Sequence, residues 1–291
     1  MLEHLQAQPV KPSRVVIIGA GGFVGGAIRK RLEAEQVATL PLTRRELDLL
    51  QDNASQKLQA MLRPDDSVVM VSALAPVKTV PQLTQNLKMA EAVCAALAAA
   101  PVSHIVYLSS DAVYADDANP VTESSYCAPS TLHGMMHAAR ELMLNSASAV
   151  PVCVLRPTLI YGAADPHNGY GPNRFRRQAA RGEPITIFGE GEEQRDHVLV
   201  EDVAALAALM LARRSRGVLN AVTGISTSFR DIAYLVAEQA GTDVPVKSVP
   251  RPGPRPHLLH RFFDITNCLK AFPGFRYTAL AEGLERAGRG A

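Results

Sequence analysis

The segment that decides the fold of this chain is Arg14-Val15-Val16-Ile17-Ile18-Gly19-Ala20-Gly21-Gly22-Phe23-Val24-Gly25-Gly26-Ala27-Ile28. Its continuous Val/Ile run, bounded by glycine, is typical of a strand buried on both faces of a parallel sheet. Gly19 can adopt backbone angles closed to other residues, Gly22 allows a ligand to approach, and Gly25 lets the next helix pack closely. The N–H groups at the start of that helix make a site for a pyrophosphate. The segment therefore predicts a dinucleotide site, with a plain strand-to-helix turn as the alternative.

Strand and helix patterns alternate along the rest of the chain, which predicts an α/β fold with a doubly wound parallel sheet. A glycine- and proline-rich stretch at residues 161–174 and a proline-rich stretch at 250–260 predict loops. Further strands are expected at residues 37–42, 67–72, 103–109, 152–156, 185–188 and 218–222, and helices at 23–35, 83–99, 131–144, 175–181 and 202–213.

Composition excludes several classes of protein. The 291 residues are 47% apolar and 20% charged, which supports a packed core, and a net charge of +2 gives no reason to expect nucleic acid as a partner. We expect no membrane span and no signal peptide, and therefore a cytoplasmic protein. The four cysteines, Cys94, Cys127, Cys153 and Cys268, lack metal-ligand spacing and are expected to be reduced thiols, a catalytic thiol at Cys127 being the less favoured alternative.

The end of the second predicted strand bears on which dinucleotide binds. A carboxylate there recognises a ribose 2′-hydroxyl, whereas arginine accommodates a 2′-phosphate. Here Thr43, Arg44 and Arg45 follow the strand, and no acid precedes Glu46. Guanidinium groups suit bidentate phosphate recognition, so we predict NADP(H), with NAD as the alternative. The competing interpretation is that both arginines are solvated surface charges.

The chain resembles the extended short-chain dehydrogenase/reductase family, the NAD(P)-dependent epimerases, dehydratases and reductases of nucleotide-linked sugars. The resemblance rests on landmarks that follow one another in family order over most of the chain. They are the turn Gly19–Gly25, the pair Asp48-Leu49, the strand Val68–Ala73, Asn86, the segments Tyr107–Tyr114 and Leu155–Gly162, and the run from Phe188-Gly189-Glu190-Gly191 through Arg195-Asp196-His197-Val198 to Asp202-Val203.

This resemblance implies a Rossmann-like dinucleotide domain formed by residues 1–162 and 196–225. It also implies a smaller, discontinuous α/β substrate domain formed by residues 163–195 and 226–291. The residues expected to bind the cofactor are Gly19, Gly21, Gly22, Phe23, Val24, Gly25, Thr43, Arg44, Arg45, Asp48, Leu49, Ser72, Ala73, Leu74, Leu108, His137 and Pro157.

The largest departure from the family pattern lies in the helix expected at 131–144. In the family, a Tyr exchanges a proton with the substrate, and a Lys four residues later lowers the Tyr pKa and holds the nicotinamide ribose. Here His133 stands in the Tyr position and His137 in the Lys position. Histidine titrates near neutral pH, so His133 could transfer the proton while His137 binds the ribose. The alternatives are a site that binds without turnover and, less favoured, a metal bound by the two histidines.

The resemblance implies that Ser110 is the catalytic hydroxyl that binds the reacting sugar oxygen, with Ser109 as the alternative by one residue of register. Asp111 is expected at the substrate. Ala112 argues against the 4,6-dehydratases of the family, which place an Asp-Glu pair at positions 111 and 112. Epimerisation through a 4-keto intermediate, or reduction of a 4-keto sugar, fits better.

Three further residues are expected at the substrate by analogy with the family: Asn173, Arg195 and Arg255. The competing interpretation of Arg195 is a structural ion pair with Glu192, Glu193 or Asp196. We therefore predict NADP(H)-linked epimerisation or keto-reduction of a nucleotide-diphosphate sugar, for surface polysaccharide or a glycosylated metabolite, by a homodimer without a bound metal. The rival prediction is a non-catalytic NADP(H)-binding regulator or inactive partner subunit.

Overall fold

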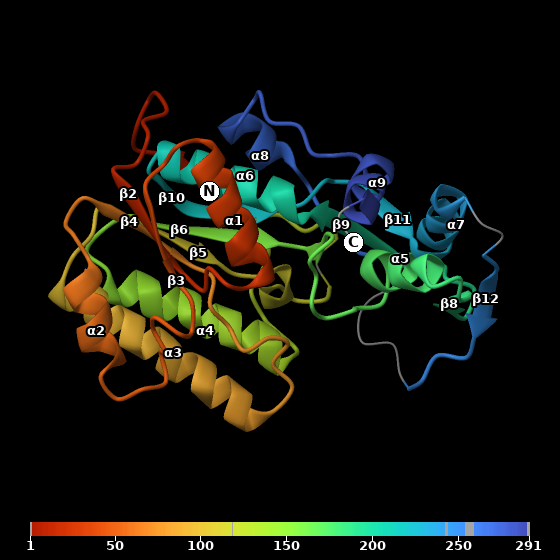
Figure 1. Cartoon of the computed structure of the whole chain (residues 1–291), viewed down its shortest axis with the longest axis horizontal. Helices are drawn as coiled ribbons and strands as arrows, with labels where there is room; N and C mark the ends of the chain where they lie inside the picture. The colour runs from red at the N-terminus through yellow and green to blue at the C-terminus, as the bar shows by residue number, and fades with distance from the viewer. Residues whose placement is uncertain (1, 118, 242–243, 254–258, 290–291) are drawn as a thin grey trace.

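The computed structural model describes residues 2–117, 119–241, 244–253 and 259–289 (Figure 1). Its central feature is a seven-stranded sheet with the order β1-β10-β6-β5-β4-β2-β3. All neighbouring strands are parallel except β1, which pairs antiparallel with β10 at one edge. The strands are β1 (Glu3–His4), β2 (Arg14–Ile18), β3 (Thr39–Leu42), β4 (Asp66–Met70), β5 (His104–Leu108), β6 (Val152–Pro157) and β10 (Ser215–Ala221). The doubly wound parallel sheet is confirmed.

Helices cover both faces of this sheet (Figure 1). On one face, α1 (Phe23–Ala34) packs against α6 (Val200–Ala212); on the other, α3 (Val80–Ala99) packs against both α2 (Ala54–Met61) and α4 (Leu132–Ala147). Alternate side chains of β2 enter the two resulting cores: Val15 and Ile17 face one, Val16 and Ile18 the other. This two-sided burial explains the unbroken apolar run of the strand.

A smaller part of the molecule lies beyond the carboxyl ends of the strands (Figure 1). It has a three-stranded sheet of order β11-β9-β7 and a parallel pair, β8 with β12. The apolar core around Phe175 and Phe229 joins these strands to the nearby helices. The elements are β7 (Leu159–Tyr161), α5 (Pro172–Ala180), β8 (Ile185–Phe188), β9 (Gln194–Leu199), β11 (Ser226–Ser228), α7 (Phe229–Ala240), β12 (Val246–Val249) and α9 (Leu280–Arg289), with α8 (Thr266–Ala271) beside β10.

Several expected elements have different bounds in the structure. The helix expected from residue 175 begins at Pro172, inside the predicted loop, because proline is well suited to the first helical position. Strands β7, β9 and β11 were not expected at all. The division into two domains at the predicted boundaries stays a prediction. In the described part of the chain, no helix combines the length and apolar character that a membrane crossing requires.

Candidate functional site

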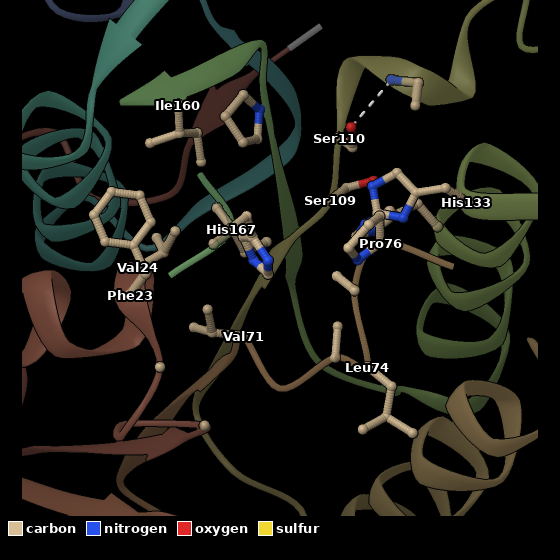
Figure 2. Close-up of a pocket in the computed structure, with 18 of the residues that line it drawn as sticks. Phe23, Val24, Val71, Leu74, Pro76, Ser109, Ser110, His133, Ile160 and His167 are labelled. Carbon is tan, nitrogen blue, oxygen red and sulfur yellow. Dashed lines mark hydrogen bonds between the residues drawn. The ribbon is translucent and has the colours of Figure 1, made fainter. Parts of the chain in front are cut away.

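A cavity of about 1180 Å³ opens at the carboxyl ends of β2 to β6 and extends toward the smaller part of the molecule (Figure 2). In an open parallel sheet this edge is where ligands bind. Phe23, Val24, Val71 and Ile160 form apolar parts of its wall, and the side chains of Ser109, Ser110 and His133 are drawn across from them (Figure 2). Residues from both the central sheet and the smaller part line one continuous space.

The glycine turn is built for close approach of backbone to backbone. Gly19 has φ of +99°, and a Cβ there would lie 2.6 Å from the backbone nitrogen of Ser72. A Cβ on Gly25 would lie 2.2 Å from the Gly19 carbonyl oxygen, so only glycine lets α1 begin this close to the turn. The N-cap residue Gly22 has no side chain to occupy the N–H groups of the first turn. The turn therefore fits the two phosphates of a dinucleotide.

Almost all of the residues predicted to bind the cofactor line this cavity. Arg45 does not: its side chain is exposed and lies outside the lining, whereas the neighbouring Arg44 contributes to it. The predicted cofactor residues in the lining are Gly19, Gly21, Gly22, Phe23, Val24, Gly25, Thr43, Arg44, Asp48, Leu49, Ser72, Ala73, Leu74, Leu108, His137 and Pro157.

Charges around the end of β3 are partly paired. Arg44 Nε lies 3.3 Å from the Asp48 carboxylate, and the Arg44 side chain remains 76% exposed. The carboxylate of Glu46 accepts hydrogen bonds from the Thr43 hydroxyl and from the Thr43 backbone N–H, and both bonds lower the pKa of Glu46. The carboxylate of Asp48 therefore lies beside the guanidinium that is predicted to recognise a 2′-phosphate, and that of Glu46 lies at Thr43 in the same turn.

The start of α4 places His133 at the cavity. The Thr131 hydroxyl accepts a hydrogen bond from the Gly134 N–H at 3.1 Å and caps the helix. A Cβ on Gly134 would lie 2.0 Å from the carbonyl oxygen of Ala112, so glycine allows α4 to pack against the short 3₁₀ turn Asp111–Val113. This close packing brings His133 and Ser110 to the same side of the cavity, as Figure 2 shows.

The two histidines of α4 are in mutual contact. Their ring centroids are 4.8 Å apart with an interplanar angle of 89°. The Val77 N–H donates to His133 Nδ1 over a long 3.5 Å, and the Tyr107 hydroxyl lies 2.8 Å from His137 Nδ1. Burial, followed by the charge of His167, lowers the pKa of His133; burial, followed by the charges of His133 and Arg140, lowers the pKa of His137 well below its ordinary value. Both rings are therefore neutral at neutral pH.

The two candidate serines have different roles in the structure. The buried Ser109 hydroxyl donates to Glu141, whose carboxylate also pairs with the guanidinium of Arg156 at 2.5 Å. Ser110 accepts from the Ala112 N–H at 3.1 Å, and its hydroxyl remains at the cavity wall. The geometry thus favours Ser110 over Ser109 as the hydroxyl that meets a substrate.

A cluster of charged side chains lines the far end of the cavity. Arg195 pairs with Glu193 at 2.5 Å, as one interpretation of the sequence expected, and it also lines the cavity. Arg251 pairs with the same carboxylate. Arg261 donates to Asp116 at 2.8 Å and lies 3.9 Å from the carboxylate of Asp111. These guanidinium groups are held in place by carboxylates.

Asn173 and Arg255 do not contribute to the described lining. Asn173 is buried, its side-chain oxygen accepts from the Gly162 N–H at 3.1 Å, and its amide donates to the Ile160 carbonyl at 3.4 Å. Its amide is used by the backbone that leaves β7 and fixes that backbone, so the place of Asn173 at the substrate stays a prediction. Arg255 lies outside the described residues.

Several residues of this site were not expected from the sequence, among them His167, Tyr107 and Arg251. His167 lines the cavity and is drawn between Val24 and His133 in Figure 2; its only signal was a titratable side chain in the glycine-rich loop. Tyr107, the partner of His137, looks like an ordinary core residue of a buried strand. Among the described residues, no group of three or more His, Cys, Asp or Glu side chains is arranged to hold a metal ion.

Comparison with known proteins gives a consistent result. Residues 15–223 match the model of the NAD dependent epimerase/dehydratase family, and this range includes the glycine turn, both serines and both histidines of α4. The chain is 26% identical over 269 residues to GDP-L-fucose synthase from Escherichia coli (strain K12), over 78% of this chain and 81% of that protein. It is 30% identical over 242 residues to 2-alkyl-3-oxoalkanoate reductase from Shewanella oneidensis, over 72% of this chain and 60% of that protein.

A solved structure described as MoeE5 in complex with UDP-glucuronic acid and NAD is similar over nearly the whole chain. The TM-score is 0.84 at 25% sequence identity, and the match covers 95% of this chain and 98% of the other. The arrangement of both the central sheet and the smaller part is therefore shared.

Proposed function

This chain belongs to the NAD-dependent epimerase/dehydratase family, and we propose that it is an NADP(H)-linked enzyme that epimerises or reduces a nucleotide-diphosphate sugar. One observation carries the proposal. The glycine turn, Ser110 and His133 come from three distant segments, and all three line the same cavity. A phosphate cradle, a hydroxyl and a titratable group side by side are the parts that transfer of a hydride and a proton at one carbon requires.

Binding of a nicotinamide dinucleotide follows from the geometry of the turn. The residues around Gly19 and Gly25 leave room for phosphates, and Arg44 supplies a guanidinium at the end of β3. We infer NADP(H) rather than NAD from this guanidinium, while the carboxylate of Glu46 acts against it. When bound, the nicotinamide supplies or accepts a hydride.

The proposed chemistry of the side chains is proton transfer and orientation. Ser110 donates a hydrogen bond to the reacting oxygen of the sugar, and His133 exchanges the proton with the same oxygen. Arg195, Arg251 and Arg261 bind the diphosphate, because fixed guanidinium groups match its oxygen pairs. His137 binds the nicotinamide ribose through its free ring nitrogen.

The rival proposal is a protein that binds NADP(H) without turnover, as a regulator or an inactive partner subunit. The contact between the Val77 N–H and His133 Nδ1 favours it, because a protonated ring could not accept that bond. At 3.5 Å the bond is too long to hold the ring in one state, so we retain the active enzyme as the main proposal. We also propose a cytoplasmic homodimer that serves the synthesis of surface polysaccharide or a glycosylated metabolite.

The experiment is a thermal-shift screen of nucleotide sugars with NADPH or NADH, followed by product analysis. A ligand that binds only the folded state raises the melting temperature. We expect NADPH alone to raise it and a nucleotide sugar to raise it further. The panel includes a 2-alkyl-3-oxo acid, the substrate type named for one relative. A shift with that acid and none with any sugar nucleotide would contradict the substrate class, and binding without product would favour the rival.

A further inference from the structure

The buried phenol of Tyr107 holds the ring of His137. Tyr107 lies in β5, is 1% exposed, and its hydroxyl oxygen is 2.8 Å from His137 Nδ1. His137 is 6% exposed, and its ring lines the cavity near the predicted ribose site. The position of one hydrogen in this contact decides which nitrogen of His137 is a donor.

Two arrangements of that hydrogen are chemically possible. Either the Tyr107 hydroxyl donates to Nδ1, and the hydrogen of the neutral ring is on Nε2, or Nδ1–H donates to the phenol oxygen. The second arrangement leaves the Tyr107 hydroxyl needing another acceptor inside the core. A buried donor without an acceptor is costly, so the surroundings of the phenol decide between the two.

Among the charges that act on the Tyr107 phenol, that of Arg140 has a larger effect on its pKa than the opposing carboxylate of Glu141. The guanidinium carbon of Arg140 lies 5.5 Å from the centroid of the Tyr107 ring, and the guanidinium is 1% exposed and anchored by a 2.9 Å hydrogen bond to the Ser72 carbonyl. A guanidinium carries only donors, so it attracts the lone pairs of the phenol oxygen and offers nothing to its hydrogen. The hydrogen is thereby directed to His137 Nδ1.

We propose that Tyr107 is a positioning residue that holds His137 as the neutral tautomer with its hydrogen on Nε2. His137 then presents one fixed N–H donor to the cavity. The role of this donor rests on the proposed function: it binds a hydroxyl of the nicotinamide ribose. A lysine at this position would bring a positive charge that the neutral His137 does not carry.

The neutral state of His137 agrees with its environment. Burial, together with the charges of His133 and Arg140, lowers the pKa of His137 well below the ordinary value. Burial also raises the pKa of Tyr107 to about 12, so the phenol keeps its hydrogen at neutral pH. Both partners therefore stay neutral, and the contact is an ordinary hydrogen bond between them.

The test is nitrogen NMR on the full chain labelled with 15N-histidine, because protonated and unprotonated ring nitrogens have well-separated shifts. The signals of His137 are assigned by their loss in His137→Gln. We expect an unprotonated Nδ1 and a protonated Nε2 in the unsubstituted protein at neutral pH. In Tyr107→Phe we expect the two tautomers to mix and the Kd for NADPH to rise roughly tenfold. Tyr161→Phe removes another buried phenol oxygen, away from His137, and should change neither quantity.

A protonated Nδ1 in the unsubstituted protein would overturn the proposal, and this spectrum decides even if Tyr107→Phe does not fold. An unchanged tautomer in a folded Tyr107→Phe would overturn it too. Failure of the proposed function looks different: the expected tautomer would be present, but NADPH would not bind to the unsubstituted protein.

Discussion

The rings of His133 and His137 meet edge to face, one turn apart on α4, with their centroids 4.8 Å apart. The outer ring is half-buried at the cavity, whereas the inner ring is buried against Tyr107. In the proposed function these two environments separate the roles: the outer ring exchanges a proton, and the inner ring donates a fixed hydrogen bond.

Replacement of His133 tests the proton transfer. His133→Ala should lower kcat by about 10²–10⁴-fold, the usual contribution of a general acid or base, while the Kd for NADPH stays within a factor of two or so. Steady-state kinetics and cofactor titration measure the two effects. Met135→Ala, a change at an exposed position of the same helix, is the control and should leave kcat unchanged. A fully active His133→Ala would show that another group transfers the proton.

The pH dependence follows from the lowered pKa of His133. Reduction of a keto sugar consumes a proton, so it needs protonated His133, which is populated only below a pKa that lies under the ordinary 6.5. We expect kcat/KM for reduction to fall as the pH rises through this value, and the reverse oxidation to speed up. Because the charge of His167 contributes to the lowering, His167→Gln should move the profile to higher pH. An unchanged pH profile in His167→Gln would show that the charge of His167 does not affect the pKa of His133.

Neighbouring arginines provide a matched test of cofactor choice. Arg44 lines the cavity and Arg45 does not. Arg44→Ala should weaken NADPH binding roughly tenfold or more, the loss of a charge-assisted hydrogen bond, and leave NADH almost unchanged. Arg45→Ala should leave the binding of both NADPH and NADH almost unchanged. Glu46→Gln removes a negative charge beside the same site and should strengthen NADPH binding. Equal losses for NADPH and NADH in Arg44→Ala would argue for NAD.

Two adjacent glycines test the turn. A Cβ on Gly25 would lie 2.2 Å from the Gly19 carbonyl oxygen, whereas one on Gly26 would lie at an ordinary 3.7 Å from Ala20. Gly25→Ala should cost about 1–3 kcal/mol of unfolding free energy and weaken dinucleotide binding, because α1 must move away from the turn. Gly26→Ala should be neutral or stabilising by up to about 1 kcal/mol. Urea unfolding and NADPH titration compare the two variants.

The pair between Glu141 and Arg156 should matter for stability. Both side chains are buried, and Glu141 also accepts from Ser109. Glu141→Gln leaves a buried guanidinium facing a neutral amide, so we expect a loss of about 3 kcal/mol in unfolding free energy. Glu33→Gln breaks an exposed pair with Arg29 and should cost less than about 1 kcal/mol. Equal losses of unfolding free energy in Glu141→Gln and Glu33→Gln would show that breaking a buried ion pair costs no more than breaking an exposed one.

Part of this molecule is encoded in short stretches of sequence. The run Val15–Ile18 with the turn from Gly19 to Gly25 predicted the strand, the helix and the cavity edge, because apolar periodicity and glycine geometry act between near neighbours. Strand β9 could not be predicted in this way. Its Arg195, Asp196 and His197 lack the apolar pattern of a buried strand, yet Asp196 is fully buried and accepts hydrogen bonds from Thr223 and Gly224 of a distant segment.

The sequence by itself determined the doubly wound sheet, the phosphate turn and the replacement of Tyr and Lys by His133 and His137. Only the tertiary structure decided that Arg44 rather than Arg45 reaches the cavity, that Asn173 serves the backbone, and that His137 is held by Tyr107. The physical reason is the distance along the chain over which each interaction acts. Backbone preferences and apolar patterns act over a few residues, whereas the direction and protonation of a side chain depend on groups that folding brings from elsewhere in the chain.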